Sequence, residues 1–253
     1  MRPAGVPARI RLELVRAWAI TKKDARIYYF RPGTIMFGIL FPLFLFFSFA
    51  VGRDLPPLLL IPGLIAITAF FSASSIGAMA VPTERRTRTY ERMITAPISA
   101  VSILFGEIVG GMIYGILMTI PPLAVAVLWF GILPANPAGL AFAIALTSFL
   151  FSAMGIMFAA LPTDNPGDVM IVLNFVRLPL IFVSGIFIPL EQLGAYAFVT
   201  SLSPLTYAQD LIRYTVTGES FFGPYVAIPV MLLFIGLFLG IGVHLHERNR
   251  RMA

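Results

Sequence analysis

The chain contains no cysteine, and only two of its 253 residues are lysines, Lys22 and Lys23. The absence of cysteine excludes disulfides, thiol catalysis and cysteine-ligated metal sites. Neither lysine follows a glycine, whereas the phosphate-binding P-loop requires a Gly-Lys pair. The chain therefore does not bind ATP through a Walker motif, and any ATP-driven work would need a motor on another chain.

Charge is scarce as well. Charged residues make up 12% of the chain, against about 25% in soluble domains. The two histidines, His244 and His246, follow the last apolar run without a nearby carboxylate cluster, which predicts interface residues rather than metal ligands. Because no nucleophile, base and orienting group occur as a set, we expect no covalent chemistry, no metal and no cofactor in this chain.

Hydrophobic residues make up 58% of the chain and are gathered into six long runs. A bilayer is crossed by about 20 residues of apolar helix. The sequence therefore predicts an all-α polytopic membrane protein. The six expected spans are residues 33–51, 57–81, 101–131, 138–161, 169–188 and 225–243.

Most of the 18 basic residues fall on one side of these spans. Eight lie in residues 1–32, four in residues 82–100 and three in the C-terminal tail. Basic residues accumulate on the cytoplasmic side of membrane proteins. Both termini and the 82–100 loop are therefore predicted to be cytoplasmic. The net charge of +6 is explained by these membrane flanks, so nucleic acid is not an expected partner.

Residues 1–32 are predicted to form a cytoplasmic amphipathic helix along the membrane, separate from a transmembrane domain over residues 33–253. Its apolar side chains would face lipid: Leu12, Val15, Trp18, Ala19 and Tyr29. Its basic side chains would reach headgroups: Arg9, Arg16, Lys23 and Arg26. A plain topogenic anchor and a coupling or gating element are both open interpretations.

The loop 82–100, PTERRTRTYERMITAPISA, is predicted to contain a second amphipathic helix. Thr83 would cap it, and Glu84 and Arg88 have the favourable i,i+4 order. An apolar stripe follows from Tyr90, Met93, Ile94 and Pro97. The opposite face carries Arg85, Arg86, Arg88 and Arg92. The pattern favours either a solvated loop or a docking element for another protein.

Residues 189–224 form the longest connection on the opposite side. They predict two short helices, 190–201 and 204–217, separated at Ser203-Pro204 and dipping into the outer leaflet.

Two charges fall inside the apolar runs, Arg177 in the fifth and Glu107 in the third. A charge at that depth is costly unless it is paired or hydrated. Because both lie in the cytoplasmic half of their spans, we expect an Arg177–Glu107 pair, either structural or facing a transport pathway.

Three segments of the chain together resemble the permease subunits of ABC-2 type transporters. In ERRTRTYERMITAPISAVSILFGEIVGG, the matching positions are Thr89, Glu91, Pro97, Ile98, Ser99 and Gly106. In VSGIFIPLEQLGAYAFVTSLSPLTYAQDLIR, they are Ser184, Gly185, Pro189, Pro204, Leu205, Thr206, Tyr207 and Arg213. Residues 40–47 and 62–75 resemble the drug and lipo-oligosaccharide exporter branch. Glu107 stands where that family usually has lysine, and Arg88 where glycine is common.

The resemblance implies six transmembrane helices per subunit, a dimer in a prokaryotic plasma membrane, and a separate ABC ATPase subunit that binds ATP and Mg. The ATPase would couple through the loop between the second and third spans. The implied coupling residues are Thr83, Glu84, Arg85, Arg86, Arg88, Tyr90, Glu91, Met93, Ile94 and Pro97. The expected function is export of a hydrophobic or amphipathic substrate such as a drug, lipid or glycolipid. Alternatives are export of a lipid-linked polysaccharide, an ion-coupled secondary transporter, for which Glu107 is the one candidate acid, and a membrane-embedded enzyme.

Overall fold

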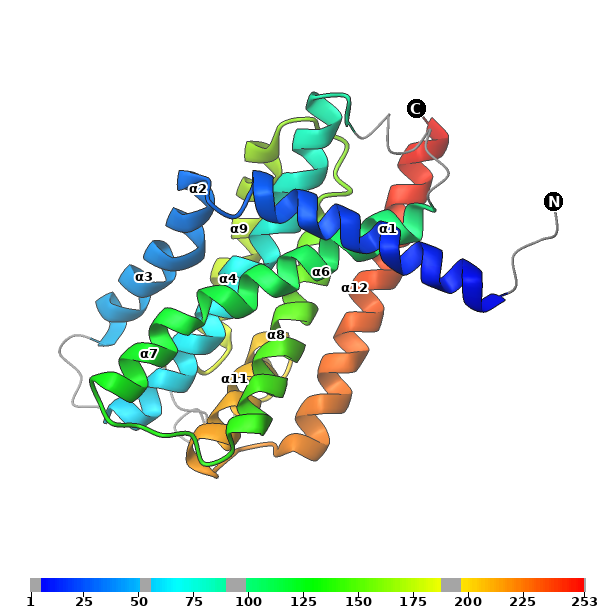
Figure 1. Ribbon diagram of the computed structural model, residues 1–253. Coiled ribbons are helices and arrows are strands. Elements are labelled where there is room, and N and C mark those ends of the chain that lie inside the picture. Colours follow the sequence, from blue (N-terminus) through cyan, green and yellow to red (C-terminus); the bar gives the residue numbers. More distant parts are fainter. Residues whose placement is uncertain (1–5, 51–55, 90–98, 188–196, 253) are drawn as a thin grey trace.

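The computed structural model describes residues 6–50, 56–89, 99–187 and 197–252, and every regular element in these ranges is a helix (Figure 1). Five stretches of helix there are long and apolar enough to cross a membrane. They are α4 (Pro57–Arg86), α6 (Ala100–Met118) with α7 (Ile120–Leu128), α8 (Pro137–Phe158), α9 (Pro166–Val183) and α12 (Pro224–Met252). The all-helical prediction is confirmed.

The first predicted span follows directly after the N-terminal helix α1 (Val6–Ile27). It consists of α2 (Pro32–Ile35), a π-helical turn η1 (Met36–Leu40) and α3 (Phe41–Ala50). Two segments together are long and apolar enough to cross a membrane, although neither is so alone: Arg11–Ile27 and Pro32–Ser48. The chain bends by 95° between them. The number of spans within the described residues is therefore five, or six if the bent pair counts as one.

The third predicted span is broken at Thr119, between α6 and α7. Pro121 and Pro122 follow in the first turn of α7. A proline is tolerated there because its missing N–H would have no intrahelical partner, whereas deeper in a helix it would break a hydrogen bond. The two prolines therefore explain why a new helix starts at this point.

α4 is the central helix of the bundle and packs against α6, α8, α9 and α11. In the most apolar stretch of α4, 89% of the residues are buried, against 22% in that of α12 and 28% in that of α9. Small residues bring its neighbours close. A Cβ built on Gly155 of α8 would lie 2.2 Å from the carbonyl oxygen of Ser74 in α4. α9 and α12 instead leave most of their surface outside the packed core.

The segment between α9 and α12 contains α10 (Ala197–Thr200) and α11 (Pro204–Thr217). The predicted bounds of the second short helix are confirmed, while most of the first lies outside the described residues. Leu205, Ala208 and Ile212 of α11 are buried, and the helix packs against α4, α8 and α12. The bundle itself therefore buries the apolar face of α11, and the dip of this helix into the outer leaflet stays a prediction.

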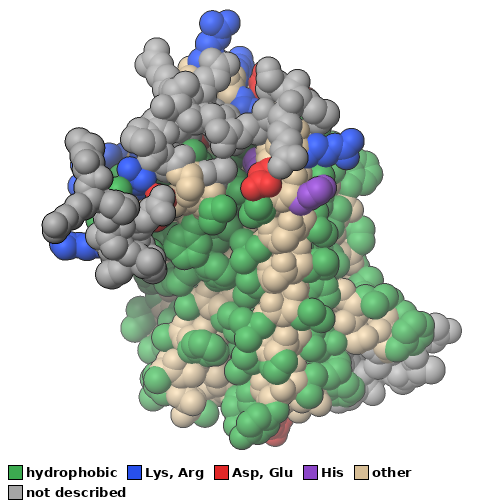
Figure 2. Space-filling model, turned by 90° about the vertical axis from the view of Figure 1, so that its right-hand side faces the viewer, with side chains coloured by type: hydrophobic (Ala, Val, Ile, Leu, Met, Phe, Trp, Pro, Cys, Tyr) green, Lys and Arg blue, Asp and Glu red, His purple; other side chains and the backbone are tan. Residues whose placement is uncertain are grey.

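Charged side chains gather at one end of the molecule. In Figure 1, α1 lies across the bundle near the end at which α4 and α12 finish. Figure 2 shows Lys, Arg and His side chains at that end and a hydrophobic surface below it. His246 of α12 is buried there, with Nε2 3.1 Å from the carbonyl oxygen of Ile156, so the expectation of an interface position was wrong for this residue.

Candidate functional site

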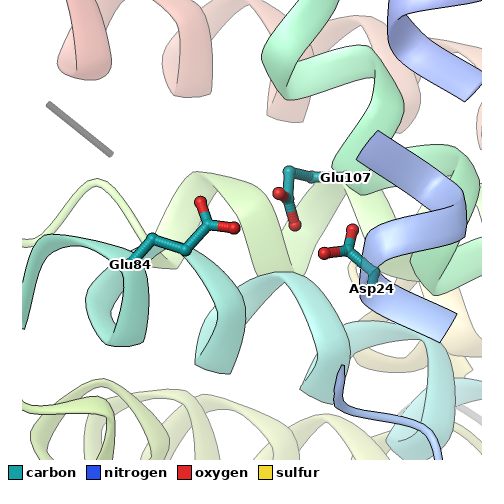
Figure 3. A group of neighbouring side chains, drawn as sticks. All are labelled: Asp24, Glu84 and Glu107. Carbon is teal, nitrogen blue, oxygen red and sulfur yellow. The ribbon is translucent and has the colours of Figure 1, made fainter. Parts of the chain in front are cut away.

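Three carboxylates from different helices meet inside the charged end of the bundle. Asp24 comes from α1, Glu84 from α4 and Glu107 from α6, and Figure 3 shows the three groups pointing toward one another. One oxygen of each lies within 4.8 Å of the others. All three residues are buried, with 0%, 3% and 0% of their surface exposed. We name Asp24, Glu84 and Glu107, together with Lys23, the charge cluster.

Lys23 supplies the positive charge of this cluster. Its Nζ lies 3.1 Å from Asp24 Oδ1 and 3.0 Å from Glu107 Oε1, and it also donates a hydrogen bond to Glu84 Oε1. Burial alone would lower the pKa of Lys23, but the neighbouring Glu107, Asp24 and Glu84 together raise it above its usual value. The ammonium therefore stays charged and bridges α1, α4 and α6.

The cluster has one ammonium for three carboxylates, so it is short of positive charge. Glu84 Oε2, Glu107 Oε2 and Asp24 Oδ2 accept no hydrogen bond from the described part of the chain. Burial raises the pKa of Asp24 to about 6, against the lowering effect of Lys23. Three carboxylates so arranged can ligate a hard divalent cation. Because the Lys23 ammonium already contacts all three, we interpret the cluster as an ion-pair network that joins helices.

Two glycines of α6 allow α1 to come close enough to form the cluster. A Cβ built on Gly106 would lie 2.7 Å from the carbonyl oxygen of Ala17, and one on Gly110 would lie 3.1 Å from Asp24 Oδ2. Thr21 donates a hydrogen bond of 2.8 Å to the Gly106 carbonyl oxygen, and Tyr29 one of 2.6 Å to that of Gly110. The backbone of α6 is thus a direct partner of α1.

The N-terminal half of α1 is hydrogen-bonded to the start of α6. Glu13 accepts hydrogen bonds from the hydroxyls of Ser99, at 3.0 Å, and Ser102. These two bonds lower the pKa of Glu13 below its usual value. Ser99 also caps α6 by accepting from the Ser102 backbone N–H. α1 is therefore bound to α6 at two points, on either side of Gly106.

The charge cluster holds both flanks of the connection between α4 and α6. Glu84 lies two residues before the end of α4, and Glu107 lies in the second turn of α6. Lys23 therefore links α1 to both of these flanks.

Comparison with known proteins identifies the family. The family model described as "ABC-2 type transporter" matches residues 14–217, which extend from α1 to the end of α11 and include the whole charge cluster. The chain belongs to the ABC-2 type transporter family. It is also 25% identical over 192 residues to the inner membrane transport permease YadH of Escherichia coli K12, covering 76% of this chain and 75% of that protein. The corresponding permease of Shigella flexneri matches to the same extent.

Membership of the ABC-2 family makes this chain a transmembrane component of an ABC transporter. Its relatives are named as transport permeases of the inner membrane, and its apolar helices make it a multi-pass protein of the plasma membrane. ABC-2 permeases usually work with an ABC ATPase subunit.

The start of the predicted coupling helix was wrong. Thr83 is not an N-cap but lies inside α4, where its hydroxyl donates to the Met79 carbonyl oxygen at 2.7 Å. α4 continues to Arg86, and Arg88 has a positive φ of 57°, which no longer belongs to a right-handed helix. The i,i+4 pair of Glu84 and Arg88 is therefore not formed within one helix, and Glu84 faces the charge cluster instead.

The other predicted coupling residues have different surroundings. Arg85 donates from Nη1 to the Leu161 carbonyl oxygen at 2.9 Å, which links α4 to the end of α8, and Arg86 is exposed. The remaining members lie outside the described residues, so the apolar stripe stays a prediction. They are Tyr90, Glu91, Met93, Ile94 and Pro97.

The predicted Arg177–Glu107 pair was wrong. Glu107 faces α1 and Lys23, whereas Arg177 contacts α4 and Asn174 of its own helix. Two of its α4 partners are serine hydroxyls, Ser74 at 2.6 Å and Ser75 at 3.1 Å. α6 and α9 each pack on α4, and this separates the two charges. Equal depth in the membrane did not determine which side of α4 each residue faces.

The described matching positions of the second resembling segment, Ser184 to Arg213, lie at the end of the bundle opposite the charge cluster. Ser184 ends α9 by donating to the Ile181 carbonyl oxygen at 2.7 Å, and Gly185 has a φ of 79°, a conformation that favours glycine. Pro204 starts α11, and the Tyr207 hydroxyl donates to the Ser201 carbonyl oxygen at 3.0 Å. Arg213 lies 3.8 Å from Glu219. Pro189 is outside the described residues.

The charge cluster itself was missed by reasoning from the sequence. Lys23 was expected at lipid headgroups and Tyr29 in lipid, yet Lys23 lies in the cluster and Tyr29 is 5% exposed. Leu12, Val15 and Trp18 are exposed, in agreement with a lipid-facing stripe. Asp24, the acidic neighbour of Lys23, could have indicated the charge cluster, because a carboxylate inside an otherwise basic segment requires a partner.

Proposed function

We propose that this chain is the permease subunit of an ATP-driven exporter, and that two copies form the transport pathway with a separate ATPase subunit. The substrate is hydrophobic or amphipathic, such as a drug, lipid or glycolipid, and leaves the cytoplasm or the inner leaflet. Family membership and relatives named as inner membrane transport permeases support this function. Neither distinguishes such substrates from a lipid-linked polysaccharide, which is the alternative cargo.

In this proposal the charged end of the bundle is cytoplasmic. The basic residues of residues 1–32, of the 82–100 loop and of the C-terminal tail support that orientation. α1 then lies at the cytoplasmic membrane face, with exposed Leu14, Val15 and Trp18 available to lipid. The ATPase binds to residues 82–100, and ATP is bound and hydrolysed only on that partner.

The observation that carries a coupling mechanism is the charge cluster. Lys23 contacts a carboxylate on the helix before the loop, Glu84, and one on the helix after it, Glu107. Force that the ATPase applies to the loop reaches both helices, and the ion pairs move α1 with them. The pathway opens as this cytoplasmic unit turns.

The test is to express the tagged permease with candidate ABC ATPase subunits of the same organism and to reconstitute the purified complex in liposomes. We expect co-purification and an ATPase rate that depends on the permease. A Lys23→Ala variant should still bind the ATPase but lose the permease-dependent part of that rate, while Lys22→Ala, an exposed neighbour, should keep it. Failure of the two subunits to associate would contradict the proposed function.

One observation favours a second candidate, an ion-coupled transporter. Three buried carboxylates at a membrane face are a feature of proton and cation pathways. In that case the permease alone would transport in response to an ion gradient, and Glu107→Gln would abolish the response. Transport by the purified chain without any ATPase would replace the ABC exporter mechanism.

A further inference from the structure

Arg177 is a buried charge whose hydrogen-bond partners in the described part of the chain are all neutral. It lies in α9 with 0% of its surface exposed. Its guanidinium donates to the Ser74 and Ser75 hydroxyls, to the Phe71 carbonyl oxygen at 3.4 Å and to the Asn174 side-chain oxygen at 3.2 Å. Within the described residues, no Asp or Glu forms an ion pair with it.

The position of Arg177 is deep in the apolar part of the bundle. It is eleven residues beyond Pro166, where α9 begins, and Ser75 is eleven residues before Arg86, where α4 ends. At a rise of about 1.5 Å per residue, both distances correspond to roughly 17 Å from the charged end. The hydrocarbon core of a bilayer is about 30 Å thick, so the guanidinium lies near its middle.

Neutral partners do not remove the cost of a charge at this depth. Buried charges in proteins are normally paired or bound to a counter-ion, and intramembrane arginines mark substrate or ion pathways. The ring of Phe71 lies 5.1 Å from the guanidinium carbon and adds a weak attraction. Nε still has no hydrogen-bond acceptor within the described structure. The site therefore has positive charge and a hydrogen-bond donor to offer an anion.

A ligand can reach Arg177 only where α9 separates from α4, because the side chain has none of its surface exposed. The opposite side of α9 is open, with Ile171, Phe175 and Phe182 exposed by 59%, 77% and 52%. Pro179 lies inside the helix two residues after Arg177. It removes one backbone hydrogen bond and weakens the helix at that point. At the boundary between α4 and α9 the rings of Phe70 and Phe71 lie 6.0 Å and 5.1 Å from the guanidinium carbon. Charge and apolar groups therefore meet there, which is the combination that an amphiphile with a charged head requires.

We propose that Arg177 binds the head group of the transported substrate, and that this substrate is an amphiphile with an apolar tail and an anionic phosphate or carboxylate head. A guanidinium recognises both groups by paired hydrogen bonds. The inference rests on the proposed transport function and narrows its substrate class. The apolar tail occupies the boundary between α4 and α9 while the head group pairs with Arg177.

The test measures binding to the purified full-length permease in a neutral maltoside detergent. Three probes are compared by calorimetry and by the shift in Tm: dodecyl phosphate, dodecyltrimethylammonium and inorganic phosphate. We expect dodecyl phosphate to bind and raise Tm. The cationic amphiphile and inorganic phosphate should have little effect, the first because of its charge and the second because it lacks a tail.

The decisive variants change only the side chain of residue 177. Arg177→Gln should weaken binding of dodecyl phosphate at least tenfold, and Arg177→Lys, which keeps the charge but loses the paired geometry, should give an intermediate affinity. Arg26→Gln removes an exposed arginine of α1 and should bind as the unchanged protein does. If Arg177→Gln does not fold, the comparison of Arg177→Lys with Arg26→Gln decides.

Equal binding of dodecyl phosphate by the unchanged protein and Arg177→Lys or Arg177→Gln would overturn the inference, as would equal binding of the cationic amphiphile. Arg177 would then be a structural brace between α4 and α9. Because binding is measured without the ATPase, this result leaves the proposed function intact. Loss of association with the ATPase subunit would instead contradict the proposed function.

Discussion

At the scale of single residues, Lys23 should be the most sensitive position of the charge cluster. Removing it leaves three buried carboxylates without their ammonium. Breaking a buried ion pair by removing one partner costs about 3–5 kcal/mol. Lys23→Ala should therefore lower the Tm of the purified permease, whereas Lys22→Ala, which is exposed, should change stability by less than about 0.5 kcal/mol. Equal Tm values for the two variants would contradict the network.

A second prediction at this scale concerns pH. The pKa of Asp24 is raised to about 6, so between its usual value and pH 6 the folded chain binds more protons than the unfolded chain. Stability should therefore fall as pH rises through this window and stay lower above it. Asp24→Asn should reduce this loss of stability with rising pH. Thermal unfolding between pH 4.5 and 7.5 would measure it.

Asp164→Asn is the matched control, because Asp164 is exposed. It should keep the pH profile of the unchanged protein. The groups that face Asp24 are Lys23 on its own helix, Glu84 on α4 and Glu107 on α6, so the Asp24→Asn profile should be flatter rather than flat. A profile unchanged by Asp24→Asn would show that Asp24 does not titrate in this range.

At the scale of elements, the contact between α1 and α6 depends on Gly106. An added Cβ would lie 2.7 Å from the Ala17 carbonyl oxygen and 2.9 Å from the Ile20 side chain, so α1 would have to move. Gly106→Ala should cost about 1–3 kcal/mol and reduce permease-dependent ATPase activity. Gly236→Ala is the control. Apart from the adjacent backbone of its own helix, no atom of the described residues lies within 4 Å of the added Cβ. Alanine also favours a helix, so the Tm of Gly236→Ala should be unchanged or higher.

Among the helices, local sequence predicted the membrane spans but neither the end of α4 nor the contacts between helices. Apolar runs located α4, α8, α9 and α12, because spanning length and hydropathy depend on local composition. The end of α4 was misplaced because Thr83 fits an N-cap and a helix interior equally well, bonding back to Met79 in the latter. The charge cluster joins residues up to 84 positions apart through close packing at Gly106 and Gly110, which no local pattern encodes.

At the scale of the whole molecule, orientation in the membrane is open to a direct experiment because the chain has no native cysteine. Single cysteines can be placed at exposed positions on opposite ends of the bundle. Arg26→Cys lies on α1 at the charged end. Glu219→Cys follows α11, near the other end, where the side chain of Glu219 is 76% exposed.

In intact cells, a membrane-impermeant maleimide should label Glu219→Cys and leave Arg26→Cys unlabelled until the membrane is permeabilised. The reason is that the basic flanks of α1 and of the 82–100 loop are retained on the cytoplasmic side. The Lys22→Cys variant provides a second marker of the charged end. The reverse pattern would place the charge cluster outside the cell. ATP is not available there, so coupling through Lys23 and the loop between α4 and α6 would then be impossible.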